Sequence, residues 1–92
     1  MEIEFDEKKS ARNIRERHLP FERAAEFDFD TALVCEDVRN PYPETRYVAV
    51  GFVDKRLHVL CFTPTRSGIR VISFRKANAR EVRDYEKTRS AD

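Results

Sequence analysis

The pattern of hydrophobic and polar positions predicts helices near both ends of the chain and strands between them. Residues 3–5 form a short β-type run, and Asp6 then provides an N-cap for a helix over residues 7–17, which contain neither proline nor glycine. Pro20 suits the first turn of a second, short helix that ends near Asp28. The first helix has a thin apolar stripe, so we expect it to contact the fold along one narrow edge. The members of that stripe are Ala11, Ile14 and Leu19.

Strand-type residues dominate the middle of the chain. Four runs rich in Val, Ile, Leu, Tyr and Phe cover residues 32–38, 46–53, 57–63 and 69–75. The connections between them are short and carry turn residues, so an antiparallel meander is the simplest sheet. Several runs are apolar on both alternating faces. This favours a sheet that helices cover on one face and a partner or a packed end covers on the other.

A capping pattern marks the last helix. Asn78 with Glu81 three residues later approximates a capping box, and Val82 and Tyr85 then form the buried side. After Lys87 the chain is polar. We therefore expect a single α+β domain over residues 1–92, an antiparallel meander with two N-terminal helices and one C-terminal helix.

Composition limits the class of protein. A chain of 92 residues builds one thin core, and no apolar run approaches the ~20 residues that a membrane span needs. The first residues are acidic where a secretory signal is basic and then apolar, so we expect a cytoplasmic protein with no membrane contact. Cys35 and Cys61 lie in apolar strands without CxxC spacing, which predicts buried, reduced thiols.

Charge is divided unevenly along the chain. The formal net charge is +1, yet residues 1–45 are acidic on balance and residues 46–92 are basic. No Asp or Glu occurs between Lys55 and Arg80, a segment with seven Lys and Arg residues. Such a segment suits an anionic partner. The alternative is that these cations pair with carboxylates of the first half across the fold.

Missing motifs exclude several chemistries. His18 and His58 are forty positions apart with no HExxH or paired cysteines, so we expect no metal site, and His58 suits a packed strand position. Neither GxGxxG nor GxxxxGK[ST] occurs, and the chain has only two glycines. No serine has a nucleophile-elbow motif around it. We therefore expect no cofactor.

Arginine is the remaining candidate for chemistry. Arg70 and Arg75 lie at the two ends of the last strand, followed by Lys76, while Arg46 and Arg66 lie at neighbouring strand or turn ends. Guanidinium groups donate in forks that match phosphate oxygens and offset the charge of a phosphorane. In a regular strand Arg70 and Arg75 point to opposite faces, so either a bulge reconciles them or the two faces bind different partners.

Individual residues along nearly the whole chain resemble the BrnT family of bacterial toxins. The matching positions are Phe5-Asp6, Lys9, Asn13, Phe21-Glu22, Ala24-Ala25, Asp37, Arg39, Tyr42, Glu44, Arg46, Gly51, Thr63, Arg70, Ile72-Ser73, Arg75-Lys76-Ala77, Glu81 and Tyr85. The block from Arg70 to Ala77 is the most specific of them. One departure is that the family's Lys-His-Gly after the first helix reads Arg17-His18-Leu19 here, so Arg17 takes the place of the family's histidine.

The resemblance implies a RelE-like fold and a ribonuclease toxin of a type II toxin–antitoxin system. Such a toxin cleaves RNA without a metal, inhibits translation and is neutralised by a BrnA-like antitoxin. Operator DNA is bound only through the toxin–antitoxin complex, which allows a toxin homodimer.

Metal-free RNA cleavage needs a deprotonated 2′-hydroxyl, a stabilised phosphorane and a protonated 5′-oxygen. We assign phosphate contact to Arg70 and Arg75, and the candidates for proton transfer are Glu44, His18 and Tyr85. RNA-binding support falls to Arg46, Arg66 and Lys76. For His18 the structural alternative is a helix C-terminal cation.

Two other functions fit the same residues. The first is a noncatalytic nucleic-acid-binding or assembly module that uses the same basic sheet. The second is a purely structural subunit. RNA that is bound but never cut would favour the first, and growth unaffected by overexpression would favour the second.

Overall fold

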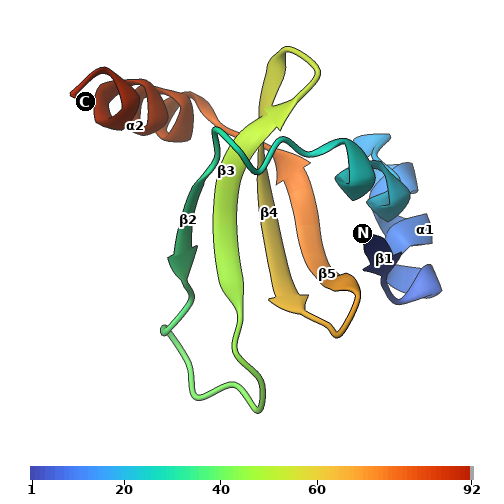
Figure 1. The fold of residues 1–92 in the computed structure, drawn as a ribbon. Coiled ribbons are helices and arrows are strands. Elements are labelled where there is room, and N and C mark those ends of the chain that lie inside the picture. Colours follow the sequence, from blue (N-terminus) through green and yellow to red (C-terminus); the bar gives the residue numbers. More distant parts are fainter. Residues whose placement is uncertain (92) are drawn as a thin grey trace.

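The computed structural model describes residues 1–91 and contains one five-stranded sheet with helices at both ends of the chain (Figure 1). In chain order the elements are β1 (Glu2–Glu4), α1 (Glu7–Arg17), the 3-10 helix η1 (Phe21–Glu26), β2 (Leu33–Glu36), β3 (Tyr47–Val53), β4 (Arg56–Pro64), β5 (Gly68–Lys76) and α2 (Ala79–Ser90). The α+β class is therefore as predicted. None of the helices in residues 1–91 is long and apolar enough to cross a membrane.

The sheet is mixed, with the strand order β1-β5-β4-β3-β2. Strands β2 to β5 form the predicted antiparallel meander. The expectation of a purely antiparallel sheet is wrong for β1, which pairs in parallel with β5. Gly68 permits this pairing, because a Cβ atom there would lie 1.9 Å from the backbone oxygen of Glu2. No side chain fits between these two backbones.

The second N-terminal helix is not an α-helix. Phe21–Glu26 forms a single 3-10 helix of six residues, with Pro20 in the N-cap position. Phe27 then returns to extended backbone, with φ −67° and ψ 129°. The segment is too short for the apolar face of a packed α-helix, and 3-10 geometry is common in such short pieces. Its buried residues are Phe21 and Ala24.

Both faces of the sheet carry hydrophobic residues, and different segments cover them. On one face, residues from η1 and from the chain up to β2 pack on Ala49, Leu60 and Phe74. We call this the η1 face. Gly51 lies there without a side chain, and an added Cβ would lie 2.7 Å from Cζ of Phe27. The glycine therefore leaves room for an aromatic ring over the strand.

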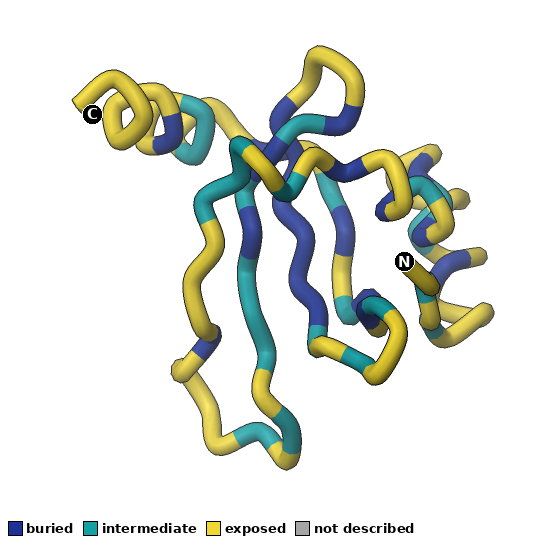
Figure 2. Tube along the Cα trace, viewed as in Figure 1, coloured by how far each residue is buried: buried dark blue, intermediate teal, exposed yellow. Residues whose placement is uncertain are grey.

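The opposite face, which we call the α2 face, packs against α2 through Tyr85 and Val82 on Leu57 and Val59. Helix α2 reaches only one end of this face, beside the β3–β4 hairpin, and the strands run on beyond it (Figure 1). The central strand β4 is buried over most of its length (Figure 2). The predicted packed end is thus α2, and it leaves part of the α2 face uncovered.

Helix α1 is attached by polar groups rather than by the predicted apolar stripe. Ala11 is exposed and the Ile14 side chain is 44% exposed, so of the three stripe residues only Leu19 is buried. Instead, Ser10 is buried, and its Oγ accepts from the backbone N–H of Phe21 at 3.0 Å. The high share of charged residues in α1 explains why it lies at the edge of the sheet.

Candidate functional site

A β-bulge in β5 brings the two predicted catalytic arginines to one face. Cys61 pairs with Ser73 whereas Phe62 pairs with Val71, so Ile72 is the extra residue. An extra residue shifts the in-and-out alternation of side chains by one position, so residues before and after the bulge can change which face they share. Val71 keeps the η1 face with Phe62, while the side chains on either side of the bulge share the α2 face. Those side chains are Arg70, Ser73 and Arg75.

The neighbouring strands extend this face into rows of side chains. Arg75 pairs with Val59, which pairs with Val50. Ser73, Cys61 and Val48 form the next row, and Arg70 with Thr63 the row after it. Arg46 directly precedes β3. It lies two residues before Val48, so its side chain points to the same face as that of Val48. The uncovered part of the α2 face therefore carries hydroxyl, thiol and guanidinium groups.

A cavity of about 320 Å³ opens on this face next to α2. Val48, Val59 and Cys61 of the sheet line it together with Ser73. Arg39 enters it from the β2–β3 loop, and Arg75 with Glu81 from the junction of β5 and α2. The cavity thus combines an apolar sheet surface with two guanidinium groups from opposite ends of the sheet face.

Arg75 is already paired with a carboxylate inside the protein. Its Nη1 and Nη2 donate to Oε1 and Oε2 of Glu81, both at 2.8 Å. This bidentate contact lowers the pKa of Glu81 to about 2, and the backbone N–H of Asn78 donates to the same carboxylate at 2.9 Å. The hydrogen bonds that Arg75 donates to Glu81 also raise the pKa of Arg75. An RNA phosphate at Arg75 would therefore share the guanidinium with Glu81.

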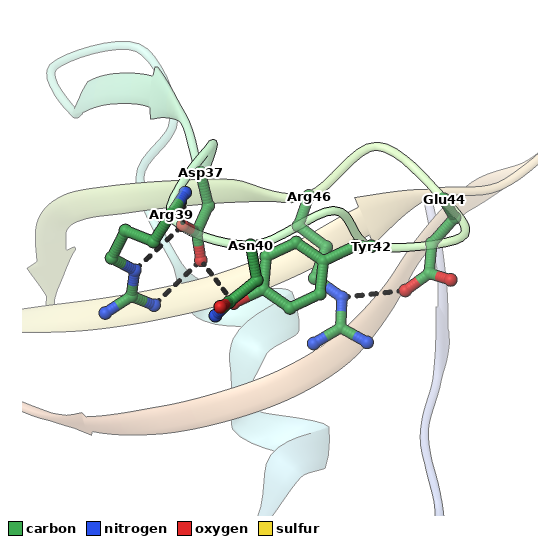
Figure 3. A network of polar contacts seen from close by, with 6 residues as sticks. All are labelled: Asp37, Arg39, Asn40, Tyr42, Glu44 and Arg46. Atoms are coloured by element: carbon green, nitrogen blue, oxygen red, sulfur yellow. Dashed lines mark hydrogen bonds and ion pairs between the residues drawn. The ribbon is translucent and has the colours of Figure 1, made fainter.

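Loop residues 37–46 hold two further arginines against fixed partners (Figure 3). Arg39 Nε and Nη2 donate to the two oxygens of Asp37 at 2.8 Å. The Asp37 side chain is 1% exposed and that of Arg39 is 75% exposed, so a buried anion orients an exposed cation. Hydrogen bonds from Arg39 lower the pKa of Asp37 to about 2. Arg39 Nη1 has no hydrogen-bond partner within residues 1–91 and can donate to a ligand.

Arg46 is held on both sides within the same loop. Its Nε donates to Glu44 Oε1 at 2.7 Å, and its Cζ lies 4.0 Å from the ring centroid of Tyr42 (Figure 3). The hydrogen bond that Arg46 donates to Glu44 is the main cause that raises the pKa of Arg46. Both Nη atoms remain available for phosphate oxygens, and cation–π stacking restricts the orientation of the guanidinium plane.

The other predicted cations are unpaired. Within residues 1–91, no carboxylate lies in ion-pair distance of Arg66, Arg70 or Lys76. Arg70 is exposed on the α2 face, and Arg66 is exposed in the β4–β5 turn. Lys76 pairs with His58, which places it on the η1 face, away from Arg70 and Arg75. The structure therefore gathers Arg46, Arg70 and Arg75 and leaves the remaining two elsewhere.

The three candidates for proton transfer lie in different places. Glu44 is next to Arg46 in the β2–β3 loop. Tyr85 of α2 is buried against the ring of Phe52, and its hydroxyl donates to the backbone oxygen of Thr31 at 2.8 Å. His18 is the exposed C-cap of α1 in left-handed conformation, with φ 55°. Of the three, Glu44 directly contacts an arginine of the site.

A second cavity, of about 300 Å³, lies between α1 and the free edge of β5. Lys9, Arg12 and Arg17 line it from the helix, and Ser73 and Arg75 from the strand. Arg75 thus borders both cavities. Arg17, which stands where the resembling family has histidine, is part of this lining, while the neighbouring His18 is not.

The structure confirms the predicted burial of Cys61 and His58 but not that of Cys35. Cys61 is buried as expected, and desolvation raises the pKa of its thiol. The expectation of burial is wrong for Cys35, because β2 is the edge strand and leaves it exposed. His58 is a packed strand residue, 3% exposed, whose burial lowers its pKa. In residues 1–91 no three His, Cys, Asp or Glu side chains are grouped to hold a metal ion.

Three charged side chains at or beside the cavity next to α2 were not among the predicted site residues. Arg39 and Glu81 line it directly, and Asp37 holds Arg39. All three belong to the residues that carry the family resemblance, in the pairs Asp37-x-Arg39 and Arg75 with Glu81. Their place among the positions that resemble the family is the signal that could have found them.

Comparison with known proteins identifies the family. No curated protein and no solved structure gives a significant match to this chain. A family model described as the ribonuclease toxin BrnT of the type II toxin–antitoxin system matches residues 5–81, which include the β5 bulge, both cavities' arginines and Glu81. The chain therefore belongs to the BrnT family of ribonuclease toxins.

Proposed function

We propose that this toxin cleaves RNA without a metal ion, by attack of a 2′-hydroxyl on the adjacent phosphorus, on the uncovered part of the α2 face. The observation that carries the proposal is the β5 bulge, which places Arg70 and Arg75 on the same face as Arg46. Guanidinium groups fixed before the reaction stabilise the phosphorane charge without reorganising. Arg70 makes no ion pair within residues 1–91, so its guanidinium group is not held by a carboxylate, although Glu4 is its partner in β1 and Asp6 interacts with it electrostatically.

The roles follow from the surroundings of each side chain. Arg70 and Arg75 contact the phosphate, with Arg46 and its two uncommitted Nη atoms beside them. Glu44 is the carboxylate next to this group and accepts the proton of the 2′-hydroxyl. In this arrangement Tyr85 fixes α2, because its hydroxyl donates to Thr31 in the loop before β2 and its ring packs on Phe52 of β3.

His18, Arg66 and Lys76 take part if the RNA strand passes over the edge of β5 and the β4–β5 turn. The cavity beside α1 supports that path, because Arg17 and Arg75 line it together. On such a path His18, at the end of α1, would donate the proton that the leaving 5′-oxygen needs, and Arg66 and Lys76 would bind more distant phosphates.

The partners belong to the same proposal. We propose a RelE-like toxin fold, a cytoplasmic location and a co-transcribed BrnA-like antitoxin that neutralises the toxin. Operator DNA is bound through the toxin–antitoxin complex, in which two toxin chains can take part. The family membership supports an antitoxin partner and an RNA target.

Cleavage in the presence of EDTA tests the proposal. We expect the purified chain to cut single-stranded RNA in EDTA and to leave a 2′,3′-cyclic phosphate. Arg70→Ala should reduce the rate by about 10²-fold or more, the scale of one lost charge-stabilising donor. Arg15→Ala is the matched control, because Arg15 is exposed on α1 and lines neither cavity.

Three results would contradict parts of this proposal. Cleavage that stops in EDTA and returns with Mg²⁺ would exclude the metal-free mechanism. RNA that binds but stays intact in every buffer would favour the noncatalytic module. An Arg70→Ala rate equal to that of Arg15→Ala would remove Arg70 from the site.

A further inference from the structure

A large groove on the molecule lies outside the proposed RNA site. It is a groove of about 640 Å³ between the β3–β4 hairpin and α2, a volume within the ~300–1,000 Å³ typical of ligand sites. We call it the hairpin groove. Phe52, Leu57 and Val82 give it an apolar floor. The hairpin and α2 project together at this end of the sheet (Figure 1).

The rim of the hairpin groove is basic. Lys55 and Arg56 line it from the hairpin, and Arg83 from α2. In the described part of the chain none of the three lies within ion-pair distance of a carboxylate. Glu86 is the acidic residue of the lining. With three cations and one carboxylate in its lining, the groove keeps a net positive charge.

An apolar floor within a cationic rim fits one kind of occupant. Aliphatic or aromatic side chains would fill the floor, and carboxylates around them would meet the three cations. Apart from Phe52 the floor is aliphatic, so the successive bases of an RNA strand would find no row of aromatic rings on which to stack. Helix α2 also separates the groove from the RNA site, because Val82 and Arg83 line the groove while Glu81 lines the cavity.

We infer that the hairpin groove binds an acidic segment of the antitoxin, anchored by apolar side chains on Phe52 and Val82. This inference rests on the proposed function, since it supplies the surface for the partner named there. Because the groove and the RNA cavity lie on two sides of the same helix, the segment binds without occupying the RNA site itself.

Charge reversal at the rim tests the inference. The probe is the antitoxin protein encoded beside this toxin, titrated against the wild type and the double variant Lys55→Glu/Arg83→Glu. Arg56 is left intact because its Nη2 donates to the backbone oxygen of Ala77 at 3.2 Å. We expect the groove variant to bind the antitoxin at least about tenfold more weakly, a typical effect of reversing close complementary charges.

The matched control is Lys8→Glu/Arg15→Glu, which changes net charge equally on exposed α1 positions. Its affinity for the antitoxin should stay within about twofold of the wild type. RNA cleavage is measured on all three proteins, and thermal unfolding confirms that each is folded. The groove variant should cleave RNA at the wild-type rate and stay toxic when the antitoxin is co-expressed.

Three outcomes count against the inference, and a fourth separates it from the proposed function. Equal weakening in both variants would indicate general charge attraction, and no weakening would place the antitoxin elsewhere. Loss of RNA cleavage in the groove variant alone would assign the groove to RNA. A wild-type chain that cleaves no RNA, combined with groove-dependent antitoxin binding, would refute the proposed function and leave the groove assignment standing.

Discussion

At the scale of single residues, Glu81 connects the proposed RNA site to the start of α2. Its carboxylate accepts two hydrogen bonds from Arg75 and one from the backbone of Asn78, and its own N–H donates to the Asn78 side chain at 2.8 Å. The capping box and the bidentate pair thus depend on one side chain. The pair with Glu81 fixes the orientation of the Arg75 guanidinium and neutralises part of its charge.

Glu81→Gln should show a pH-dependent loss of stability. Glutamine keeps the capping geometry but removes the charge from the contact with Arg75. Because the pKa of Glu81 falls from 4.5 to about 2 on folding, the ionised pair stabilises the fold above about pH 4.5 and this contribution disappears as pH falls toward 2. We expect roughly 1 kcal/mol at pH 7, discounted for partial exposure.

Urea unfolding at pH 7, 5 and 3 measures that difference. The gap between wild type and variant should be constant from pH 7 to 5 and clearly smaller at pH 3. A gap that does not change over this range would mean that the pair contributes no charge-dependent stability. Glu86→Gln, on the same helix and outside this pair, serves as the control.

Among the single-residue interactions, the sequence could predict those between near neighbours in the chain. Asp6 caps α1 and Asn78 with Glu81 caps α2, as expected, because capping involves neighbours three residues apart. The pair of Arg75 with Glu81 depends on how the chain turns between β5 and α2, which residue types alone do not fix. The same holds for Asp37, whose burial requires the folded loop.

At the scale of elements, α1 is held to the sheet by one amide. Asn13 Nδ2 donates to the backbone oxygens of Leu19 and Phe74, each at 2.9 Å. The first bond closes the end of α1 and the second joins it to β5. Since Ile14 and Ala11 are exposed, these bonds replace the apolar contacts that usually fasten a helix.

Asn13→Ala should therefore destabilise the fold by about 1–3 kcal/mol, because two partly buried carbonyl groups lose their donor. Ala11→Ser on the exposed side of the same helix is the control, with an expected change below about 0.5 kcal/mol. Chemical denaturation of both variants checks the difference. Equal stabilities would show that α1 is fastened by other contacts.

The positions of elements with strong local periodicity could be predicted from the sequence, but the pairing of strands in the sheet was harder to predict. All four middle strands and both α-helices occur where the pattern placed them, and their ends differ from the predicted ones by at most three residues. The parallel partner of β1 and the position of the bulge at Ile72 depend on contacts between distant segments. The pattern allowed for a bulge that would reconcile Arg70 with Arg75, but only the register of β4 against β5 locates it.

For the molecule as a whole, folding does not cancel the uneven charge of the two halves. Most ion pairs within residues 1–91 join residues of the same half, as Arg39 does with Asp37 and Arg75 with Glu81. Arg70 and the rim of the hairpin groove stay unpaired within residues 1–91. The basic segment between Lys55 and Arg80 therefore supplies two separate surfaces rather than one continuous patch.

The salt dependence of RNA binding should distinguish these surfaces. Each phosphate contact on single-stranded nucleic acid contributes a slope of about −0.7 to log K against log salt concentration. With a fully 2′-O-methylated RNA, which cannot be cleaved by its own 2′-oxygen, Arg70→Ala should make the slope shallower by about 0.7. Lys55→Glu/Arg83→Glu should leave it near the wild-type value, because the hairpin groove lies across α2 from the RNA site. If both changes flattened the slope equally, RNA would span the two surfaces and the division of the basic segment would be wrong.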